Sequence, residues 1–148
     1  MLRTFNRPHF QEEQSHQISQ ELVTIFEKRR TIREFSQQKP ASSIIKNAIK
    51  VASLAPSGAN AQPWDFALIE NKALKEEIRR LSEIEENQFY HSNPNEKWIN
   101  DLKHLHTDEK KQFLTDAPYL IVIFYSHFHI DENEQKKTHY YAKESVGL

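Results

Sequence analysis

Two stretches of the sequence hold residues whose types and spacing suit anion and cofactor binding. Arg29, Arg30 and Arg33 lie within five residues, and the loop Ala55-Pro-Ser-Gly-Ala-Asn-Ala-Gln-Pro-Trp64 follows. Guanidinium groups bind phosphate through paired hydrogen bonds, and backbone N–H groups beside a hydroxyl can complete such a cradle. Taken alone, the arginines also suit a solvated cationic face, and the loop also suits an ordinary helix-to-strand connection.

The elements around this loop follow from hydrophobic periodicity. Apolar residues at helical spacing predict a helix over Glu21 to Arg30 and a second helix from Ser42 or Ser43, either of which can cap it, to about Leu54. Alternation from Trp64 to Ile69 predicts a strand. Residues 1 to 20 are polar and are expected to form an arm, so the domain prediction is an arm over 1–20 and one domain over 21–148.

The second half of the chain adds one helix and one strong strand. Leu74, Ile78 and Leu81 form a stripe that predicts an amphipathic surface helix over Lys72 to Asn87. The segment Glu83 to Trp98 is polar and is expected to be mobile. The apolar run Tyr119 to Tyr125 predicts a strand buried on both faces at the centre of the sheet. A further helix is predicted from Tyr140 to Leu148.

The stretches Arg29-Arg-Thr-Ile-Arg33, Ala55-Pro-Ser-Gly-Ala-Asn60 and Gln62-Pro-Trp64 resemble, in order and spacing, the opening signature of the FMN-dependent nitroreductase superfamily. The resemblance implies an α+β fold with a mixed sheet flanked by helices. It also implies an FMN cofactor whose phosphate and ribityl chain meet the arginine-rich segment and whose ring meets the Pro-Ser-Gly turn. The residues implicated in cofactor binding are Arg29, Arg30, Thr31, Arg33, Pro56, Ser57 and Gly58.

Further motifs resemble the iodotyrosine deiodinase branch of that superfamily; they are Glu83-Ile-Glu-Glu86, Tyr90, Lys97-Trp98, Lys111, Asp116-Ala-Pro-Tyr-Leu-Ile-Val-Ile-Phe124 and Lys137-Thr-His-Tyr-Tyr141. In that branch a glutamate, a tyrosine four residues later and a downstream lysine hold the amino-acid end of a halotyrosine. The corresponding residues are Glu86, Tyr90 and Lys111, and a zwitterion does need an anion and a cation. The backbone N–H of Ala59 would bind the substrate phenolate, the catalytic role assigned here. Without the family, Glu86 and Tyr90 at helical spacing suit an ordinary surface helix.

Composition narrows the class of protein. Twenty basic and 21 acidic residues give a formal charge of −1, with no basic stripe typical of nucleic-acid binding. The chain has no cysteine, which excludes thiolate metal sites and is compatible with a reducing compartment. Met1 to Phe5 lead into polar residues, with no apolar run of transmembrane length, so we expect a cytoplasmic protein without a membrane partner.

Other chemistries find little support in the sequence. His104 with His106 and His127 with His129 are spaced by two residues, and no His-Glu-x-x-His motif accompanies them, so no metal site is expected. No Gly-x-Ser-x-Gly motif indicates a hydrolase.

The resemblance covers the N-terminal two-thirds of a nitroreductase-like enzyme, and we expect a C-terminally truncated domain. The family implies a homodimer with an exchanged arm, a small aromatic substrate, and NAD(P)H or a reductase as electron donor. The function predicted is FMN-dependent reductive dehalogenation of halotyrosine-like phenols. The alternatives are a general nitroreductase or quinone-type reductase, and a catalytically inactive fragment.

Overall fold

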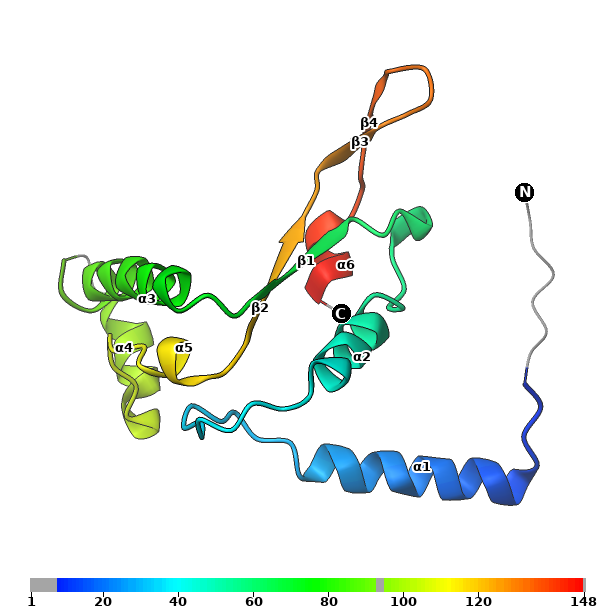
Figure 1. The fold of residues 1–148 in the computed structure, drawn as a ribbon, viewed down its shortest axis with the longest axis horizontal. Coiled ribbons are helices and arrows are strands. Elements are labelled where there is room, and N and C mark those ends of the chain that lie inside the picture. Colours follow the sequence, from blue (N-terminus) through cyan, green and yellow to red (C-terminus); the bar gives the residue numbers. More distant parts are fainter. Residues whose placement is uncertain (1–7, 93–94, 148) are drawn as a thin grey trace. The chain divides into compact units, whose positions relative to one another are not determined.

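The structure is a computed structural model that describes residues 8–92 and 95–147 (Figure 1). Met1–Arg7, Asn93, Pro94 and Leu148, some of which belong to segments discussed above, lie outside the described residues. The chain divides into two units, residues 1–33 and 34–148. Among the helices described, none combines the length and the hydrophobicity of a transmembrane segment.

The first unit contains one helix, α1 (Glu12–Glu27). The Gln14 side chain accepts a hydrogen bond from the Gln11 N–H over 3.2 Å, and two glutamates in the first turn suit the positive end of the helix dipole. The helix predicted over Glu21 to Arg30 therefore begins well before Glu21 and ends before Arg30. Hydrophobic periodicity could not locate its first turns, because those turns are polar.

The second unit is organised on two paired strands, β1 (Trp64–Ile69) and β2 (Leu120–Tyr125). They pair antiparallel in full register, so that the first residue of each strand lies opposite the last residue of the other. Ile69 thus lies opposite Leu120. Both strands, and their pairing with each other, are confirmed.

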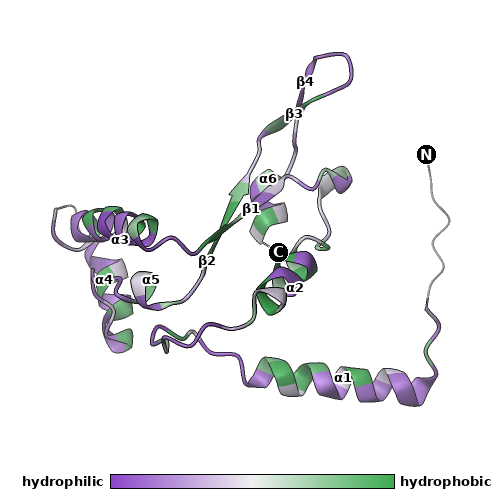
Figure 2. Ribbon diagram, in the orientation of Figure 1, coloured by the Kyte–Doolittle hydropathy of each residue, from purple (hydrophilic) through white to green (hydrophobic). Residues whose placement is uncertain are grey.

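The burial predicted for β2 is wrong. The side chains of Ile121, Ile123 and Phe124 are exposed, with 57% of Phe124 accessible, although the strand is strongly apolar (Figure 2). Within the described residues β2 pairs with one strand, and the short helix α6 (Ala142–Gly147) contacts it. One neighbouring strand and one short helix do not cover both faces of a strand.

Helix α2 (Ser42–Ala52) leads to the loop before β1. Its N-cap is Ala41, so the prediction that Ser42 or Ser43 caps the helix is wrong; both serines lie inside the first turn. The C-terminal end of α2 and the sheet line a common cavity of about 470 Å³. The helix therefore faces the strands, as predicted, but a cavity separates them where close packing was expected. The cavity is lined by Val51, Ala52, Ala55, Trp64, Phe66, Ile123, Ser145, Val146 and Gly147.

Helix α3 (Lys72–Asn87) has the predicted bounds. The Asn71 side chain caps it by accepting the Leu74 N–H over 2.9 Å. A π-helical turn (Gln88–Ser92) extends it, and α4 (Glu96–Leu102) follows after a break. The segment predicted to be mobile is therefore helical through Ser92; its mobility stays a prediction.

The packed face of α3 is polar, which the apolar stripe did not predict. Leu74 and Leu81 are about half exposed, whereas Lys75 is only 6% exposed. Lys75 contacts the short helix α5 (Phe113–Asp116), because its ammonium donates to the carbonyl oxygens of Thr115 and Ala117 at 3.1 and 2.7 Å. The carbonyls at the end of α5 thus gain a charged donor.

A second antiparallel pair, β3 (Phe128–Ile130) with β4 (Lys136–Thr138), forms a hairpin that the sequence did not predict (Figure 1). Asp131 organises its turn, because Oδ1 accepts the N–H groups of Gln135 and Asn133, each at 2.9 Å. These hydrogen bonds, that of Gln135 first, hold the pKa of Asp131 below its ordinary value.

Candidate functional site

The loop between α2 and β1, residues 55–64, closes on its own serine. The Ser57 Oγ accepts the Gln62 N–H over 2.9 Å, and the Ser57 carbonyl accepts the Asn60 N–H over 3.0 Å. Between them lies a single 3₁₀ turn, Gly58–Asn60. The loop is therefore held in one shape by local hydrogen bonds, as the density of turn-forming residues predicts.

Three residues of this loop without glycine's freedom adopt positive φ angles. They are Ala59 at 51°, Asn60 at 53° and Gln62 at 47°. The left-handed region costs an L-residue with a β-carbon about 1–2 kcal/mol, and asparagine tolerates it best. Such a run of unfavourable conformations is typical of functional loops, where surrounding contacts impose the backbone geometry.

The N–H groups of the loop differ in whether they have an acceptor. Those of Gly58, Asn60, Ala61 and Gln62 all donate within the chain. The N–H of Ala59 has no acceptor among residues 8–92 and 95–147. Ala59 therefore offers a backbone donor that an external acceptor can use.

Gly58 lies at a point of close packing. A β-carbon at this position would lie 3.0 Å from the Tyr140 carbonyl oxygen and 3.3 Å from the Tyr141 ring. The Gly58 N–H also donates to the Ser145 Oγ over 3.3 Å. The 55–64 loop is thus packed closely against the chain that leads into α6.

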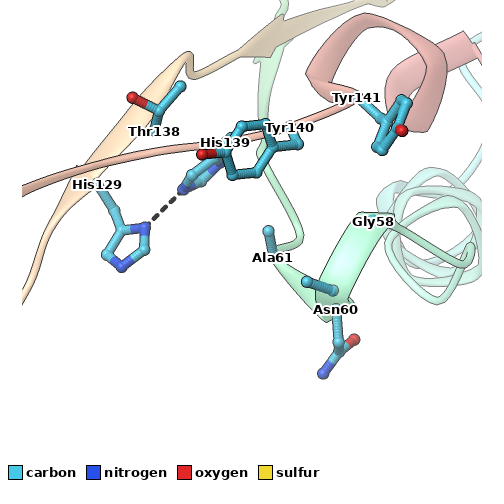
Figure 3. Close-up of a pocket in the computed structure, with 9 residues that line it drawn as sticks. Gly58, Asn60, Ala61, His129, Thr138, His139, Tyr140 and Tyr141 are labelled. Atoms are coloured by element: carbon cyan, nitrogen blue, oxygen red, sulfur yellow. Dashed lines mark hydrogen bonds between the residues drawn. The ribbon is translucent and has the colours of Figure 1, made fainter.

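The loop borders a cavity of about 670 Å³ (Figure 3). On its opposite side the Nδ1 of His129 and the Nε2 of His139 lie 2.7 Å apart. Neither histidine was predicted to lie near a site, because the hairpin that positions them was not predicted. The cavity is lined by Gly58, Ala59, Asn60, Ala61, His129, Thr138, His139, Tyr140 and Tyr141.

The arginine-rich segment follows α1 without regular secondary structure. Arg30 caps the helix, since its Nη1 donates to the carbonyl oxygens of Glu27 at 2.6 Å and Arg29 at 2.8 Å. Arg29, Arg30, Thr31 and Arg33 belong to the first unit, whereas Pro56, Ser57 and Gly58 belong to the second. Their grouping into one cofactor site stays a prediction.

The three residues predicted to hold an amino-acid zwitterion lie close together. The Lys111 Nζ is 3.1 Å from the Glu86 Oε2, with side chains 17% and 37% exposed. The Tyr90 hydroxyl lies 3.0 Å from the Thr107 Oγ1, four residues before Lys111. The Glu86–Lys111 ion pair and the Tyr90–Thr107 hydrogen bond thus both join the segment after α4 to the end of α3 and the turn that extends it.

Beside this cluster is a cavity of about 480 Å³ with aromatic walls. The Phe89 ring makes edge contacts with the rings of Tyr90 and Trp98, with centroids 5.1 and 5.0 Å apart. The lining residues are Ser82, Glu85, Glu86, Phe89, Tyr90, Trp98 and Leu102. A largely apolar cavity whose lining includes two carboxylates and one phenol suits a ligand that is itself an aromatic ring with a cationic group.

Glu83, one turn before Glu86, binds the backbone N–H of Lys111 with its side chain. The Glu83 Oε1 accepts the Arg79 Nε over 2.7 Å and the Lys111 N–H over 2.9 Å. These two hydrogen bonds, that of Arg79 first, hold the pKa of Glu83 below its ordinary value. Glu83 was not predicted to have a role; its spacing of four residues from Arg79, typical of a helical ion pair, was the available signal.

Ala59 is not part of the Glu86–Lys111 cluster. It lines the cavity beside the histidine pair, whereas Glu86 and Tyr90 line the aromatic cavity. The described residues contain no group of three or more histidine, cysteine, aspartate or glutamate side chains arranged to hold a metal ion.

Comparisons with known proteins agree on one family. The profile of the Nitroreductase family matches residues 26–146. Iodotyrosine deiodinase of Hydra vulgaris is 40% identical over 139 residues, which are 94% of this chain and 51% of that protein. Iodotyrosine deiodinase 1 of Homo sapiens is 36% identical over 144 residues, which are 97% of this chain and 50% of that protein. The chain thus spans about half the length of these curated relatives.

Two solved structures extend the agreement to the fold. The crystal structure of oxidized iodotyrosine deiodinase bound to FMN and 3-iodo-L-tyrosine matches with a TM-score of 0.74 and 36% identity, covering 86% of this chain and 63% of that one. An FMN-dependent nitroreductase from Clostridium difficile matches with a TM-score of 0.58 at 22% identity, covering 88% and 51%, and is similar in fold. The predicted α+β, nitroreductase-like fold is confirmed.

Proposed function

The chain belongs to the nitroreductase family. From this membership we propose that it is an FMN-dependent oxidoreductase, or the N-terminal part of one, that reductively removes halide from halotyrosine-like phenols. The observation that carries the proposal is the pair formed by Glu86 and Lys111, 3.1 Å apart beside an aromatic cavity. A general nitroreductase has no need of such a pair, because its substrates lack a zwitterion.

Glu86 and Lys111 satisfy each other in the absence of ligand. An amino-acid zwitterion replaces this one contact by two, since its ammonium binds the Glu86 carboxylate and its carboxylate binds the Lys111 ammonium. The cavity beside this pair is lined by Phe89, Tyr90 and Trp98, whose edge contacts hold them in place, so an apolar surface adjoins the charged end of the ligand. The recognised class is therefore an aromatic amino acid.

FMN is the cofactor of this proposal, and the residues that would hold it are Arg29, Arg30, Thr31, Arg33, Pro56, Ser57 and Gly58. The 55–64 loop fits such a role, because Gly58 lets the backbone pack tightly and the adjoining cavity of about 670 Å³ has the size of a cofactor site. When bound, reduced FMN would supply the two electrons that, together with one proton, replace a carbon–halogen bond by a carbon–hydrogen bond, with release of halide.

Ala59 has the catalytic role in this proposal. Its N–H, which has no acceptor among the described residues, donates to the phenolate oxygen of the substrate. A backbone donor in a fixed loop stabilises negative charge without reorganisation, which is the way oxyanion sites act. The positive φ of Ala59, 51°, belongs to the loop conformation in which this N–H has no acceptor among the described residues.

The test compares two substrates on the FMN-loaded, chemically reduced protein. Iodide release from 3-iodotyrosine is measured beside reduction of a nitroaromatic that has no amino-acid group. Glu86→Gln and Lys111→Met each remove a charged hydrogen bond of about 1.5–3 kcal/mol, so each lowers kcat/KM for iodotyrosine by about tenfold or more. Glu77→Gln is the matched control, because Glu77 pairs with Arg80 on the exposed side of α3.

Reduction of the nitroaromatic stays within about twofold of wild type in all three variants, since the lost contacts recognise only the zwitterion. An unchanged kcat/KM for iodotyrosine, or equal losses on both substrates, argues against the recognition role. A wild-type protein that reduces the nitroaromatic and releases no iodide is a general reductase.

We also propose a homodimer in a cytoplasmic location, with NAD(P)H or a reductase as electron donor. The support is the family resemblance, together with a sequence without cysteine, which is compatible with a reducing compartment. Analytical ultracentrifugation tests the dimer, cell fractionation tests the location, and flavin reduction by NADPH under anaerobic conditions tests the donor.

A further inference from the structure

We propose that Glu83 is a positioning residue for substrate recognition: it binds the backbone of Lys111 and thereby fixes where the Lys111 ammonium meets the substrate carboxylate. The inference rests on the proposed function for its substrate, but its geometry stands by itself. Glu83 has no direct contact with the proposed ligand; it acts through Lys111.

One carboxylate oxygen of Glu83 joins α3 to the segment that carries Lys111. The Glu83 Oε1 accepts both the Arg79 Nε, at 2.7 Å, and the Lys111 N–H, at 2.9 Å. The Arg79 and Glu83 side chains are each less than one-third exposed, so this pair is better shielded than an ordinary surface ion pair. A hydrogen bond from a backbone N–H to a carboxylate is stronger than one to a neutral acceptor.

Two glutamates on one face of α3 bind different parts of Lys111. Glu83 and Glu86 are three residues apart, and both lie within reach of Lys111. Arg79 neutralises Glu83, so Glu83 binds the Lys111 N–H while the Lys111 ammonium pairs with Glu86 over 3.1 Å. The backbone and the side chain of one lysine are thus held by different carboxylates.

The Lys111 ammonium has three N–H donors, and its backbone position decides how they face a ligand. Its ammonium donates to the carbonyl oxygen of Asp108 over 2.8 Å and pairs with Glu86, which engages two of its three donors. When a zwitterion replaces the Glu86 contact, the ammonium donors that face the ligand carboxylate are correctly placed only while the lysine backbone stays in place.

The segment is pinned at a second point, where the Tyr90 hydroxyl meets the Thr107 Oγ1 at 3.0 Å. Residues between Thr107 and Lys111 are therefore held at both ends against α3 and the π-helical turn. Loss of the Glu83 contact frees the end that carries the cation. The energetic consequence falls on ligand orientation, because a misplaced charge loses most of its directional hydrogen bonding.

The experiment uses Glu83→Ala and Glu83→Gln, with Glu77→Gln as the control on the same helix. The first readout needs no activity: the hydrogen-exchange protection and the proton chemical shift of the Lys111 amide, measured by NMR. We expect protection to fall by about tenfold in Glu83→Ala, as loss of a charged hydrogen bond predicts, and to fall less in Glu83→Gln, whose amide oxygen still accepts. The control leaves the Lys111 amide unchanged.

The second readout separates KM from kcat for 3-iodotyrosine and for 2-iodophenol, which lacks the zwitterion. Glu83→Ala raises KM for iodotyrosine by about tenfold, with kcat within about twofold, and leaves iodophenol turnover unchanged. Glu83→Gln restores part of the loss.

An unchanged Lys111 amide in both Glu83 variants overturns the proposal, as do equal losses on iodotyrosine and iodophenol, which a merely structural role would cause. If the wild-type protein does not release iodide from iodotyrosine, the proposed function fails. The positioning of Lys111 by Glu83 is then still decided by the amide readout.

Discussion

The ammonium of Lys75 donates to the carbonyl oxygen of Ala117 over 2.7 Å, across 42 residues of sequence. It also donates to the Thr115 carbonyl, and the side chain is buried. Lys75→Met keeps most of the apolar stem but leaves two carbonyl groups without their charged donor. We expect a loss of about 2–3 kcal/mol in the free energy of unfolding, measured by urea denaturation. Lys72→Met, at an exposed position on the same helix, is the control and changes stability little; equal effects would contradict the role of Lys75.

Arg33 is predicted to contribute to FMN binding. Arg33→Ala weakens FMN binding by about tenfold or more, since a charged hydrogen bond is worth about 1.5–3 kcal/mol. Fluorescence titration of FMN measures the effect, and Arg29→Ala and Ser57→Ala change affinity in the same direction. Arg80→Ala, which removes a cation from the exposed face of α3, is the control. Unchanged flavin affinity in all three site variants rejects the proposed phosphate and ring contacts.

The 55–64 loop gives opposite predictions for two adjacent residues. Ala59→Gly relieves a left-handed conformation that costs about 1–2 kcal/mol, and the added chain entropy stabilises the unfolded state by about 0.4–1 kcal/mol, so we expect a net gain in stability of about 0–1.6 kcal/mol. Gly58→Ala places a β-carbon 3.0 Å from the Tyr140 carbonyl oxygen and destabilises by more than about 1 kcal/mol. Thermal unfolding of both variants decides; a destabilised Ala59→Gly contradicts the strain.

Asp131 predicts a pH dependence in the β3–β4 turn. Its native pKa is lowered, chiefly by the N–H of Gln135, so its stabilisation is complete above the ordinary aspartate pKa and is lost as the pH falls through the lower native value. The amide protons of Asn133 and Gln135 shift together over that acidic range in NMR titrations. In Asp131→Asn the chemical shifts of these two amide protons no longer change over that pH range. Amides that titrate at the ordinary aspartate value would show that the turn does not favour the charged carboxylate.

Periodicity located the elements that have strong apolar patterns. The bounds of β1 and α3 and the pairing of β1 with β2 followed from alternation, helical spacing and one long apolar run. The same reasoning misjudged what covers β2, because a sequence gives the hydrophobicity of a strand but not the number of its neighbours. The exposed Phe124 shows the difference.

The candidate site was predictable where a motif named residue types and unpredictable where tertiary contacts decide. Glu86 and Lys111 came from a resemblance, and their ion pair lies across 25 residues of sequence that no local pattern links. The buried Lys75 and the anchoring Glu83 were missed, because a polar face at helical spacing usually indicates solvent. His129 and His139 were missed with the hairpin that pairs them.

The register of β1 with β2 has an evolutionary consequence. Ile69 lies opposite Leu120, so the chain leaves the sheet after Ile69 and returns to it beside the same position. Two antiparallel strands paired in this way can be joined by a tight turn, but here residues 70–119 form the connection. Glu86, Tyr90 and Lys111 all lie within this insertion, and the 55–64 loop lies outside it. Extra loop length costs little entropy, so the insertion can grow, shrink or be exchanged between relatives without moving the strands. Substrate range can thus diverge as a module while the cofactor loop is inherited unchanged.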